Sequence, residues 1–215
     1  MKKVDIKELV INNPVLAIMR GVPKERIIDH AEAIVDGGIG FFEVALNSPD
    51  ALSEIAMLRK HFGDSVCIGA GTAITVERAK AAIEAGAQFL LSPSTNEDVL
   101  QYCHGEGIAI MPGALTPTDV SLCLRYGFDT IKLFPAGDMP MSYVKSLKGP
   151  FDETEYVAIG GVNSSNAADF IKAGYIGIGL GSNLMPKDAI KMGDYKTASE
   201  SVYNILESVR KAKIK

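Results

Sequence analysis

One unit recurs along the chain and limits the possible folds more than any other feature. It is a short apolar run, followed by a stretch with helical spacing, followed by a glycine. The glycines Gly38, Gly86, Gly107, Gly127 and Gly174 end such helical stretches and stand shortly before the next apolar run. A glycine after the last periodic residue is typical of a helix C-terminus. The pattern therefore predicts strands that alternate with helices.

The unit occurs eight times after an amphipathic first helix over residues 3–12. The expected strands cover residues 15–19, 39–46, 66–70, 89–91, 108–111, 130–134, 157–159 and 176–180. The expected helices between and after them cover residues 23–36, 48–62, 75–85, 96–104, 116–126, 140–147, 163–173 and 195–211. The strands are continuous apolar runs, which is typical of a parallel sheet covered by helices.

Eight units with little linker between them predict a (β/α)8 TIM barrel with an N-terminal helix, as a single domain over residues 1–215. A doubly wound open sheet is the alternative, because it is built from the same unit. The length of 215 residues and the hydrophobic content of 47% are enough for one full core. In either fold, ligands bind where the strands end, so the residues at those ends are the candidates for a site.

The overall composition argues against several classes of partner. The net charge is -4 and no basic stripe is present, so we expect no nucleic-acid partner. No apolar run reaches membrane length and the first residues mix charged with apolar side chains, so we expect no membrane partner and a cytoplasmic protein. The three cysteines form no CxxC pair and the three histidines lie far apart, so we expect no disulfide framework and no metal site.

Lys132 needs a specific explanation, because it interrupts the apolar run over residues 130–134. Side chains alternate along a strand, so Ile131 and Leu133 point one way and Lys132 the other. If those neighbours face the covering helices, Lys132 faces inward. Burial can lower the pKa of a lysine by ~3–5 units and leave a neutral amine that forms a Schiff base with a carbonyl. The alternative is a lysine whose stem lies in the wall and whose ammonium reaches solvent or a carboxylate.

Two further charged residues stand at strand positions. Glu43 interrupts the second apolar run, and a carboxylate close to Lys132 could transfer the protons of a Schiff-base reaction. The alternative is a structural ion pair between Glu43 and Lys132. Arg20 ends the first strand and offers a planar fork for a substrate carboxylate, the alternative being a surface arginine.

Glycines gather at three strand ends. Gly69-Ala70-Gly71-Thr72 ends the third strand, where the backbone can approach a ligand closely. The seventh and eighth strands end at Gly160-Gly161 and Gly181-Ser182. Barrels often bind phosphate through the backbone N–H groups of these two loops, so we expect a phosphate site there. The alternative is that the glycines only permit tight turns.

These segments together resemble the 2-keto-3-deoxy-6-phosphogluconate (KDPG) and 4-hydroxy-2-oxoglutarate (KHG) aldolases, class I lyases that are trimeric (β/α)8 barrels. The resemblance extends over nearly the whole chain. It rests on Phe42-Glu43-Val44 with Leu46, Gly69-Ala70-Gly71-Thr72, Ser92-Pro93, Met111-Pro112-Gly113, Ile131-Lys132-Leu133-Phe134-Pro135-Ala136, Gly160-Gly161-Val162 and Gly179-Leu180-Gly181-Ser182.

The resemblance implies a role for each matching residue. Lys132 would form the Schiff base, and Glu43 would be the general acid and base. Substrate binding is implied for Arg20 and Thr72 on the pyruvyl carboxylate, for Phe134 in the pocket wall, for Pro93, and for Asn47 near the aldehyde half. The implied phosphate ligands are Gly160, Gly161, Gly181 and Ser182.

The implied reaction cleaves a phosphorylated keto acid, the 2-keto-3-deoxy-6-phospho sugar acid, to pyruvate and glyceraldehyde 3-phosphate. KHG could also be cleaved, to pyruvate and glyoxylate. No cofactor is required, and the family likeness implies a homotrimer. A phosphosugar isomerase or epimerase on the same barrel, and a non-catalytic phosphometabolite-binding protein, are the alternatives.

One segment departs from the gluconate type. After Leu46 the gluconate enzymes usually carry Arg-Thr, whereas this chain has Asn47-Ser48-Pro49, which resembles the 2-keto-3-deoxy-6-phosphogalactonate aldolases. Ser92-Pro93 is closer to the gluconate type. The sequence therefore leaves open which C4 epimer is the substrate.

Overall fold

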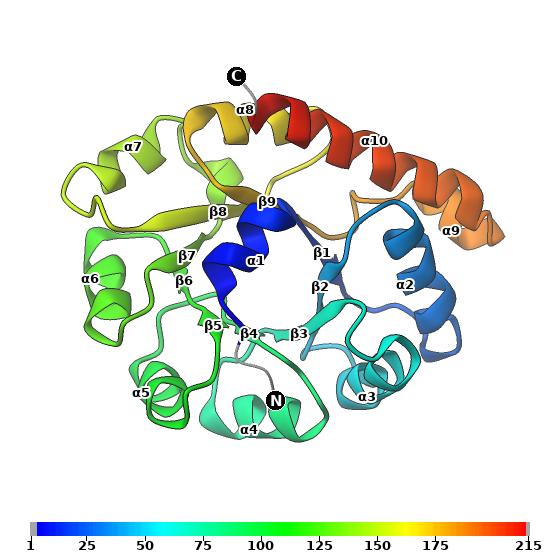
Figure 1. The fold of residues 1–215 in the computed structure, drawn as a ribbon, viewed down its shortest axis with the longest axis horizontal. Helices are drawn as coiled ribbons and strands as arrows, with labels where there is room; N and C mark the ends of the chain where they lie inside the picture. The colour runs from blue at the N-terminus through cyan, green and yellow to red at the C-terminus, as the bar shows by residue number, and fades with distance from the viewer. Residues whose placement is uncertain (1–3, 214–215) are drawn as a thin grey trace.

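The computed structural model describes residues 4–213, which form a closed ring of parallel strands surrounded by helices (Figure 1). The strands are β1 (Val15–Met19), β2 (Phe41–Ala45), β3 (Cys67–Gly71), β4 (Leu90–Leu91), β5 (Ile110–Met111), β6 (Gly113–Ala114), β7 (Thr130–Leu133), β8 (Glu155–Ile159) and β9 (Gly177–Leu180). Their order is β5-β4-β3-β2-β1-β9-β8-β7-β6, and each pair of neighbours is parallel. The predicted (β/α)8 barrel is confirmed, and the open sheet is excluded.

Strands β5 and β6 are two parts of the fifth barrel strand, separated by Pro112. Pro112 links β5 and β6, the two ends of the strand order, along the chain, and its carbonyl accepts the backbone N–H of Lys132 in β7 at 2.9 Å. Proline has no N–H to give to the other neighbour. On that side the next N–H along the chain, that of Gly113, donates to the Ser92 hydroxyl at 3.3 Å. The sequence predicted a strand ending at residue 111, whereas its pairing resumes beyond the proline.

Helices cover the outside of the ring, except for the first, which lies across one end of it. They are α1 (Ile6–Asn12), α2 (Ile27–Asp36), α3 (Ala51–Phe62), α4 (Val76–Glu84), α5 (Glu97–Glu106), α6 (Pro117–Arg125), α7 (Tyr143–Lys148), α8 (Ala167–Ala173), α9 (Lys187–Met192) and α10 (Tyr195–Lys213), with the short 3-10 turns η1 (Lys24–Arg26) and η2 (Ala136–Asp138). Residue 3, the expected start of the first helix, lies outside the described part. Helix α9 was not predicted. All five glycines of the repeated unit have a positive φ, between 64° and 114°.

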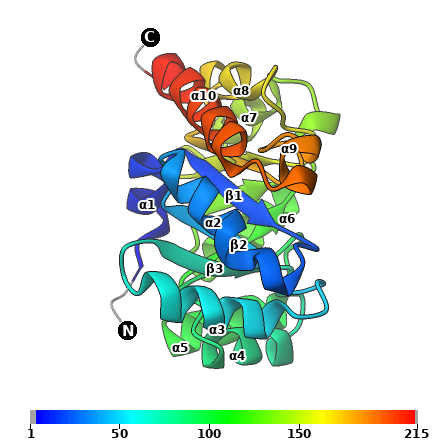
Figure 2. The same cartoon turned by 90° about the vertical axis from the view of Figure 1, so that its right-hand side faces the viewer.

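The hydrophobic residues form two layers. The outer layer lies between strands and helices and contains Ile131 and Leu133 of β7. The inner layer fills the barrel with Leu16, Phe41 and Val157 among others. Helix α1 closes one end of the barrel, where the strands begin, and contributes Ile6 and Val10 to the inner layer (Figures 1 and 2). The opposite end of the barrel, where the strands finish, is the end at which barrels of this kind bind their ligands.

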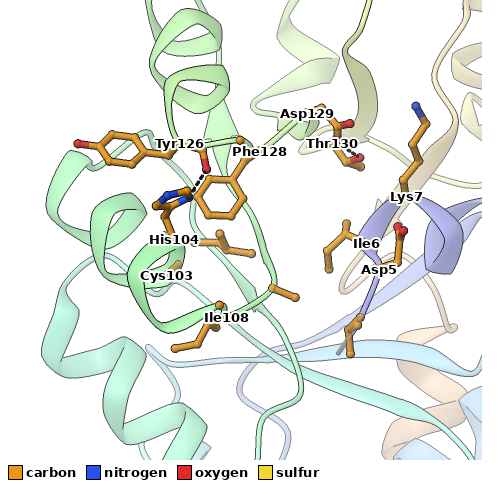
Figure 3. A pocket seen from close by; sticks show the side chains of 15 residues that line it. Asp5, Ile6, Lys7, Cys103, His104, Ile108, Tyr126, Phe128, Asp129 and Thr130 are labelled. Carbon is orange, nitrogen blue, oxygen red and sulfur yellow. Dashed lines mark hydrogen bonds between the residues drawn. The ribbon is translucent and has the colours of Figure 1, made fainter. Parts of the chain in front are cut away.

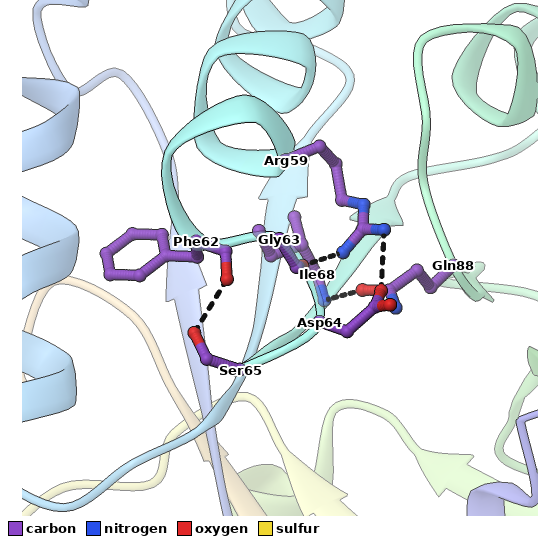
Figure 4. A network of polar contacts seen from close by, with 7 residues as sticks. All are labelled: Arg59, Phe62, Gly63, Asp64, Ser65, Ile68 and Gln88. Atoms are coloured by element: carbon purple, nitrogen blue, oxygen red, sulfur yellow. Dashed lines mark hydrogen bonds and ion pairs between the residues drawn. The ribbon is translucent and has the colours of Figure 1, made fainter.

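A polar network fixes the turn that leads into β3 (Figure 4). Arg59, near the end of α3, donates to the carbonyl of Gly63 and to Asp64 Oδ1, the latter at 3.1 Å. The side chain of Gln88 accepts the N–H of Ile68 at 2.8 Å. These contacts set the start of β3, which carries Gly71 and then Thr72 at its other end.

Within residues 4–213 no helix is long and apolar enough to cross a membrane. The same residues contain no group of three or more His, Cys, Asp or Glu side chains that could hold a metal ion.

Candidate active site

Nine of the eleven residues predicted for the site line one cavity of about 340 Å³ at the carboxyl ends of the strands. They are Arg20, Thr72, Pro93, Lys132, Phe134, Gly160, Gly161, Gly181 and Ser182. The other two, Glu43 and Asn47, do not line it. A larger cavity of about 600 Å³ lies at the opposite end, between α1 and the ends of α5 and α6 (Figure 3). None of the predicted site residues lines this larger cavity. Because barrel enzymes carry their active sites where the strands finish, the cavity of about 340 Å³ is the candidate active site.

Lys132 lies inside the barrel, as strand alternation predicted. Its side chain is only 5% exposed, while Ile131 and Leu133 face the outer layer. Its Nζ lies 5.0 Å from the centre of the Phe134 ring. No salt bridge joins Lys132 to a carboxylate among the described residues. Burial lowers the pKa of Lys132. The charge of Glu43 raises this pKa in part, and the charge of Arg20 lowers it further. The site therefore favours the neutral amine more than water does.

Glu43 lies deeper than the cavity wall and is 2% exposed. Its carboxyl group rests on the backbone of β3, because a Cβ added to Gly71 would lie 2.4 Å from Glu43 Oε2. This oxygen is buried and has no hydrogen-bond partner within the described chain. Burial raises the pKa of Glu43, and the charges of Lys132 and Arg20 partly offset that rise. The carboxyl is therefore well suited to take up and hold a proton.

Arg20 follows the last residue of β1 and is exposed, yet it lines the cavity. Ile18, two residues earlier on the same face, lines it as well. The Arg20 charge acts on the pKa of both Lys132 and Glu43. Arg20 is thus placed where a substrate carboxylate would meet a cation next to the amine.

Thr72 has an unusual backbone. Its φ is 64°, and it is the one non-glycine residue between residues 4 and 213 with a positive φ. This region is strained for a β-branched residue, and such strain concentrates at functional sites. The turn is held by the N–H of Ile74, which donates to the Thr72 carbonyl at 2.9 Å. This turn places Thr72 in the cavity wall.

The loops after β8 and β9 expose backbone donors. The N–H groups of Gly161, Val162, Ser182 and Asn183 have no acceptor within the part of the chain that the structure describes. The N–H of Gly137 donates to the Gly160 carbonyl at 2.8 Å, so turn η2 supports the first loop. Unpaired N–H groups that converge on a cavity form an anion-binding surface.

Asn47 is exposed on the loop after β2 and stays outside the cavity lining. Its neighbour Ser48 is buried and accepts the N–H of Gly21 at 2.9 Å, which ties the loops after β1 and β2 together. The sequence singled out Asn47 for its departure from a motif, and that departure carries no information on where the side chain points.

Some residues of the cavity wall were not predicted. They are Ile18, Ile159, Val162, Gly179 and Asn183. Ile18 could have been found by strand alternation from Arg20, and Val162 and Asn183 directly follow predicted loop residues. Asn166 is also new, because its side-chain amide donates to the Gly161 carbonyl at 3.0 Å and supports the loop from outside the cavity.

A closed (β/α)8 barrel with a shielded lysine, a buried carboxyl and glycine loops at the strand ends defines an enzyme that acts on small anionic metabolites. The sequence model of the family described as KDPG and KHG aldolase matches residues 6–200. This chain therefore belongs to the KDPG and KHG aldolase family, which confirms the resemblance found in the motifs.

Known relatives carry two different substrate names. A 2-dehydro-3-deoxy-6-phosphogalactonate aldolase of Escherichia coli is 35% identical over 173 residues, which cover 80% of this chain and 84% of the relative. A 2-dehydro-3-deoxy-phosphogluconate aldolase of Treponema pallidum is 34% identical over 195 residues, covering 87% and 91%. The structure of a KDPG aldolase from Legionella pneumophila, with pyruvate captured as a covalent carbinolamine, has a TM-score of 0.87 at 28% identity and covers 94% of this chain and 98% of that one.

Proposed function

We propose that this protein is a class I aldolase that cleaves a 2-keto-3-deoxy-6-phospho sugar acid to pyruvate and glyceraldehyde 3-phosphate. The observation that carries the proposal is Lys132. It is a buried lysine of lowered pKa, without a salt bridge among the described residues, in the wall of a cavity at the carboxyl end of the barrel. Family membership supports the same reaction.

The reaction begins when the neutral amine of Lys132 attacks the C2 carbonyl of the substrate. The carbinolamine loses water and becomes an iminium ion, which draws electrons from the neighbouring carbon. Glu43, directly or through a water molecule, takes the proton of the C4 hydroxyl. The C3–C4 bond then breaks, its electron pair forms an enamine, and glyceraldehyde 3-phosphate leaves. Protonation of C3 and hydrolysis release pyruvate and restore the amine.

The remaining residues would hold the two charged ends of the substrate. We place the pyruvyl carboxylate at Arg20 and Thr72, next to Lys132. We place the phosphate at the unpaired N–H groups of the loops that carry Gly161 and Ser182. Both ends then lie in one cavity with the reacting carbons between them, and Phe134 lies beside the amine.

Borohydride reduction in the presence of pyruvate tests the Schiff base. We expect the reduced pyruvyl group to appear on Lys132 in a peptide mass spectrum. The Lys132→Arg variant should take up no label, while Lys145→Arg, which changes an exposed lysine of α7, should be labelled like the wild type. An unmodified Lys132 at saturating pyruvate would contradict the mechanism.

The substrate epimer is a separate question, because the galactonate and gluconate relatives are almost equally similar to this chain. Pyruvate release, followed with a coupled dehydrogenase, should be compared for the two phosphorylated epimers and for KHG. An isomerase or epimerase would convert substrate without forming pyruvate. A non-catalytic binding protein would bind substrate and leave it unchanged.

We also propose that the chain acts as a homotrimer in the cytoplasm, as the family likeness implies. Light scattering coupled to size-exclusion chromatography measures the mass directly. A mass of three chains is the expected result, and a monomer that is fully active would contradict the trimer.

A further inference from the structure

A second cavity of about 270 Å³ lies beside the catalytic cavity, outside the ring of strands. It is enclosed by the loop after β1, by α2 and by α9 together with the segment before it. The side chain of Arg26 in η1 donates to the carbonyl of Ile190 in α9 at 3.1 Å, which holds the outer wall in place. We name this space the side cavity.

The wall of the side cavity is apolar over most of its area and cationic at a few points. Ile34, Leu184 and Met185 are buried apolar members of that wall. Arg20, Lys187 and Lys191 also line it, and no acidic residue does. None of these three cations makes an ion pair or a hydrogen bond within residues 4–213. Such a cavity is matched by a ligand with an apolar body and a negative charge.

His30 gives the same cavity a neutral polar group. Its ring is partly buried and makes no hydrogen bond to any described residue. Burial lowers the pKa of His30 to about 4, so the ring is uncharged at neutral pH. It can therefore donate one hydrogen bond and accept another without repelling the cations.

The two cavities share part of one wall. Ile18, Arg20, Gly181 and Ser182 line both of them. Arg20 is the only cation in this shared set. A negative charge in the side cavity would therefore attract the guanidinium that we place at the substrate carboxylate.

We propose that the side cavity binds a small organic monoanion with an apolar body, such as a short-chain carboxylate, and that bound ligand draws Arg20 away from the catalytic cavity. The apolar body lies against Ile34, Leu184 and Met185, and the carboxylate lies among Arg20, Lys187 and Lys191. The volume limits the ligand to a small molecule. Binding is independent of the proposed function, whereas its effect on turnover rests on it.

Calorimetric titration with hexanoate tests the binding. We expect one saturable site in the wild type and much weaker binding of hexanamide, which has the same chain without the charge. The double variant Lys187→Glu/Lys191→Glu should weaken hexanoate binding about tenfold. Lys196→Glu, which reverses one exposed charge on α10 outside the side cavity, is the control and should bind like the wild type.

Two variants locate the bound probe. Val22→Phe places a larger side chain in the side cavity from the loop after β1 and so fills part of its space. This variant should abolish binding while the circular dichroism spectrum stays unchanged. Lys132→Ala, which alters only the catalytic cavity, should leave hexanoate affinity within about twofold of the wild type. Absent binding, equal binding of hexanamide, or loss of binding in Lys132→Ala would overturn the proposed site.

Steady-state kinetics test the coupling through Arg20. Hexanoate should raise KM for the cleaved phospho sugar acid severalfold and leave kcat unchanged. An unchanged KM at saturating hexanoate would overturn the coupling. If no substrate yields pyruvate, the proposed function fails. The titrations still test whether the side cavity binds the anion, because they do not depend on turnover.

Discussion

At the scale of single residues, the position of Glu43 depends on the absence of a side chain at Gly71. The Glu43 carboxyl group lies where the Cβ of any larger residue at position 71 would be, 2.4 Å from Glu43 Oε2. We expect Gly71→Ala to displace the carboxyl group and lower kcat at least tenfold, measured by pyruvate release. Gly105→Ala is the control, because a Cβ there meets no atom within 4 Å. A fully active Gly71→Ala would show that the carboxyl position is unimportant.

Glu43 itself can be tested by an isosteric change. Glu43→Gln keeps the shape and removes the proton-accepting group, so turnover should fall roughly 10²–10⁴-fold. Burial raises the pKa of Glu43, so above the unfolded value of 4.5 the folded chain holds a proton that the unfolded chain has lost. The stability contribution of Glu43 therefore falls as pH rises above 4.5. Urea unfolding should show that Glu43→Gln gains stability relative to the wild type between pH 5 and pH 7.

The sequence was informative about single residues wherever a charge interrupts an apolar strand. Lys132 and Glu43 could be recognised because alternation leaves them one face, and both are buried in the structure. Loop residues offer no such periodicity. Asn47 was therefore chosen without knowledge of its direction, and the supporting contacts of Ser48 and Asn166 could not be foreseen.

At the scale of secondary-structure elements, α1 acts as a plug for the end of the barrel where the strands begin. Val10 is 1% exposed and belongs to the inner layer, while the next residue, Ile11, is 50% exposed. Val10→Ala should cost about 1–2 kcal/mol of unfolding free energy, because it leaves a cavity under the plug. Ile11→Ala on the same helix should change that free energy by less than about 0.5 kcal/mol. Equal effects in urea unfolding would contradict a specific plug.

Most elements could be predicted because helix ends and strand runs are marked by local chemistry. Helix α6, for example, starts with a capping box between Thr116 and Asp119. Helix α9 was missed because it is a short helix that follows Pro186 directly, with no side-chain cap to mark its start. The split of the fifth strand was missed because a proline after an apolar run is read as the end of the strand. Only the pairing of Gly113 and Ala114 with β7 shows that the strand continues beyond Pro112.

At the scale of the whole molecule, His30 links folding stability to pH. The pKa of His30 falls to about 4 in the folded chain from its ordinary value of 6.5. Between these two values the unfolded chain binds a proton that the folded chain does not, so stability falls as pH falls through this window. His30→Gln should therefore lose about 2 kcal/mol less stability than the wild type between pH 7 and pH 5 in urea unfolding. Between pH 7 and pH 8 both proteins should change in parallel.

The two halves of the ring differ in the number of paired positions between neighbouring strands. The interface of β2 with β3 has five paired positions and that of β7 with β8 has four, whereas β3 with β4 has one and β4 with β5 and β6 with β7 have two each. Lys132 stands where the two kinds of interface meet, because β7 pairs with β8 at four positions and with β6 at two. The longer pairing with β8 therefore fixes the backbone that carries the nucleophile, whatever adjustment the shorter pairings on its other side undergo.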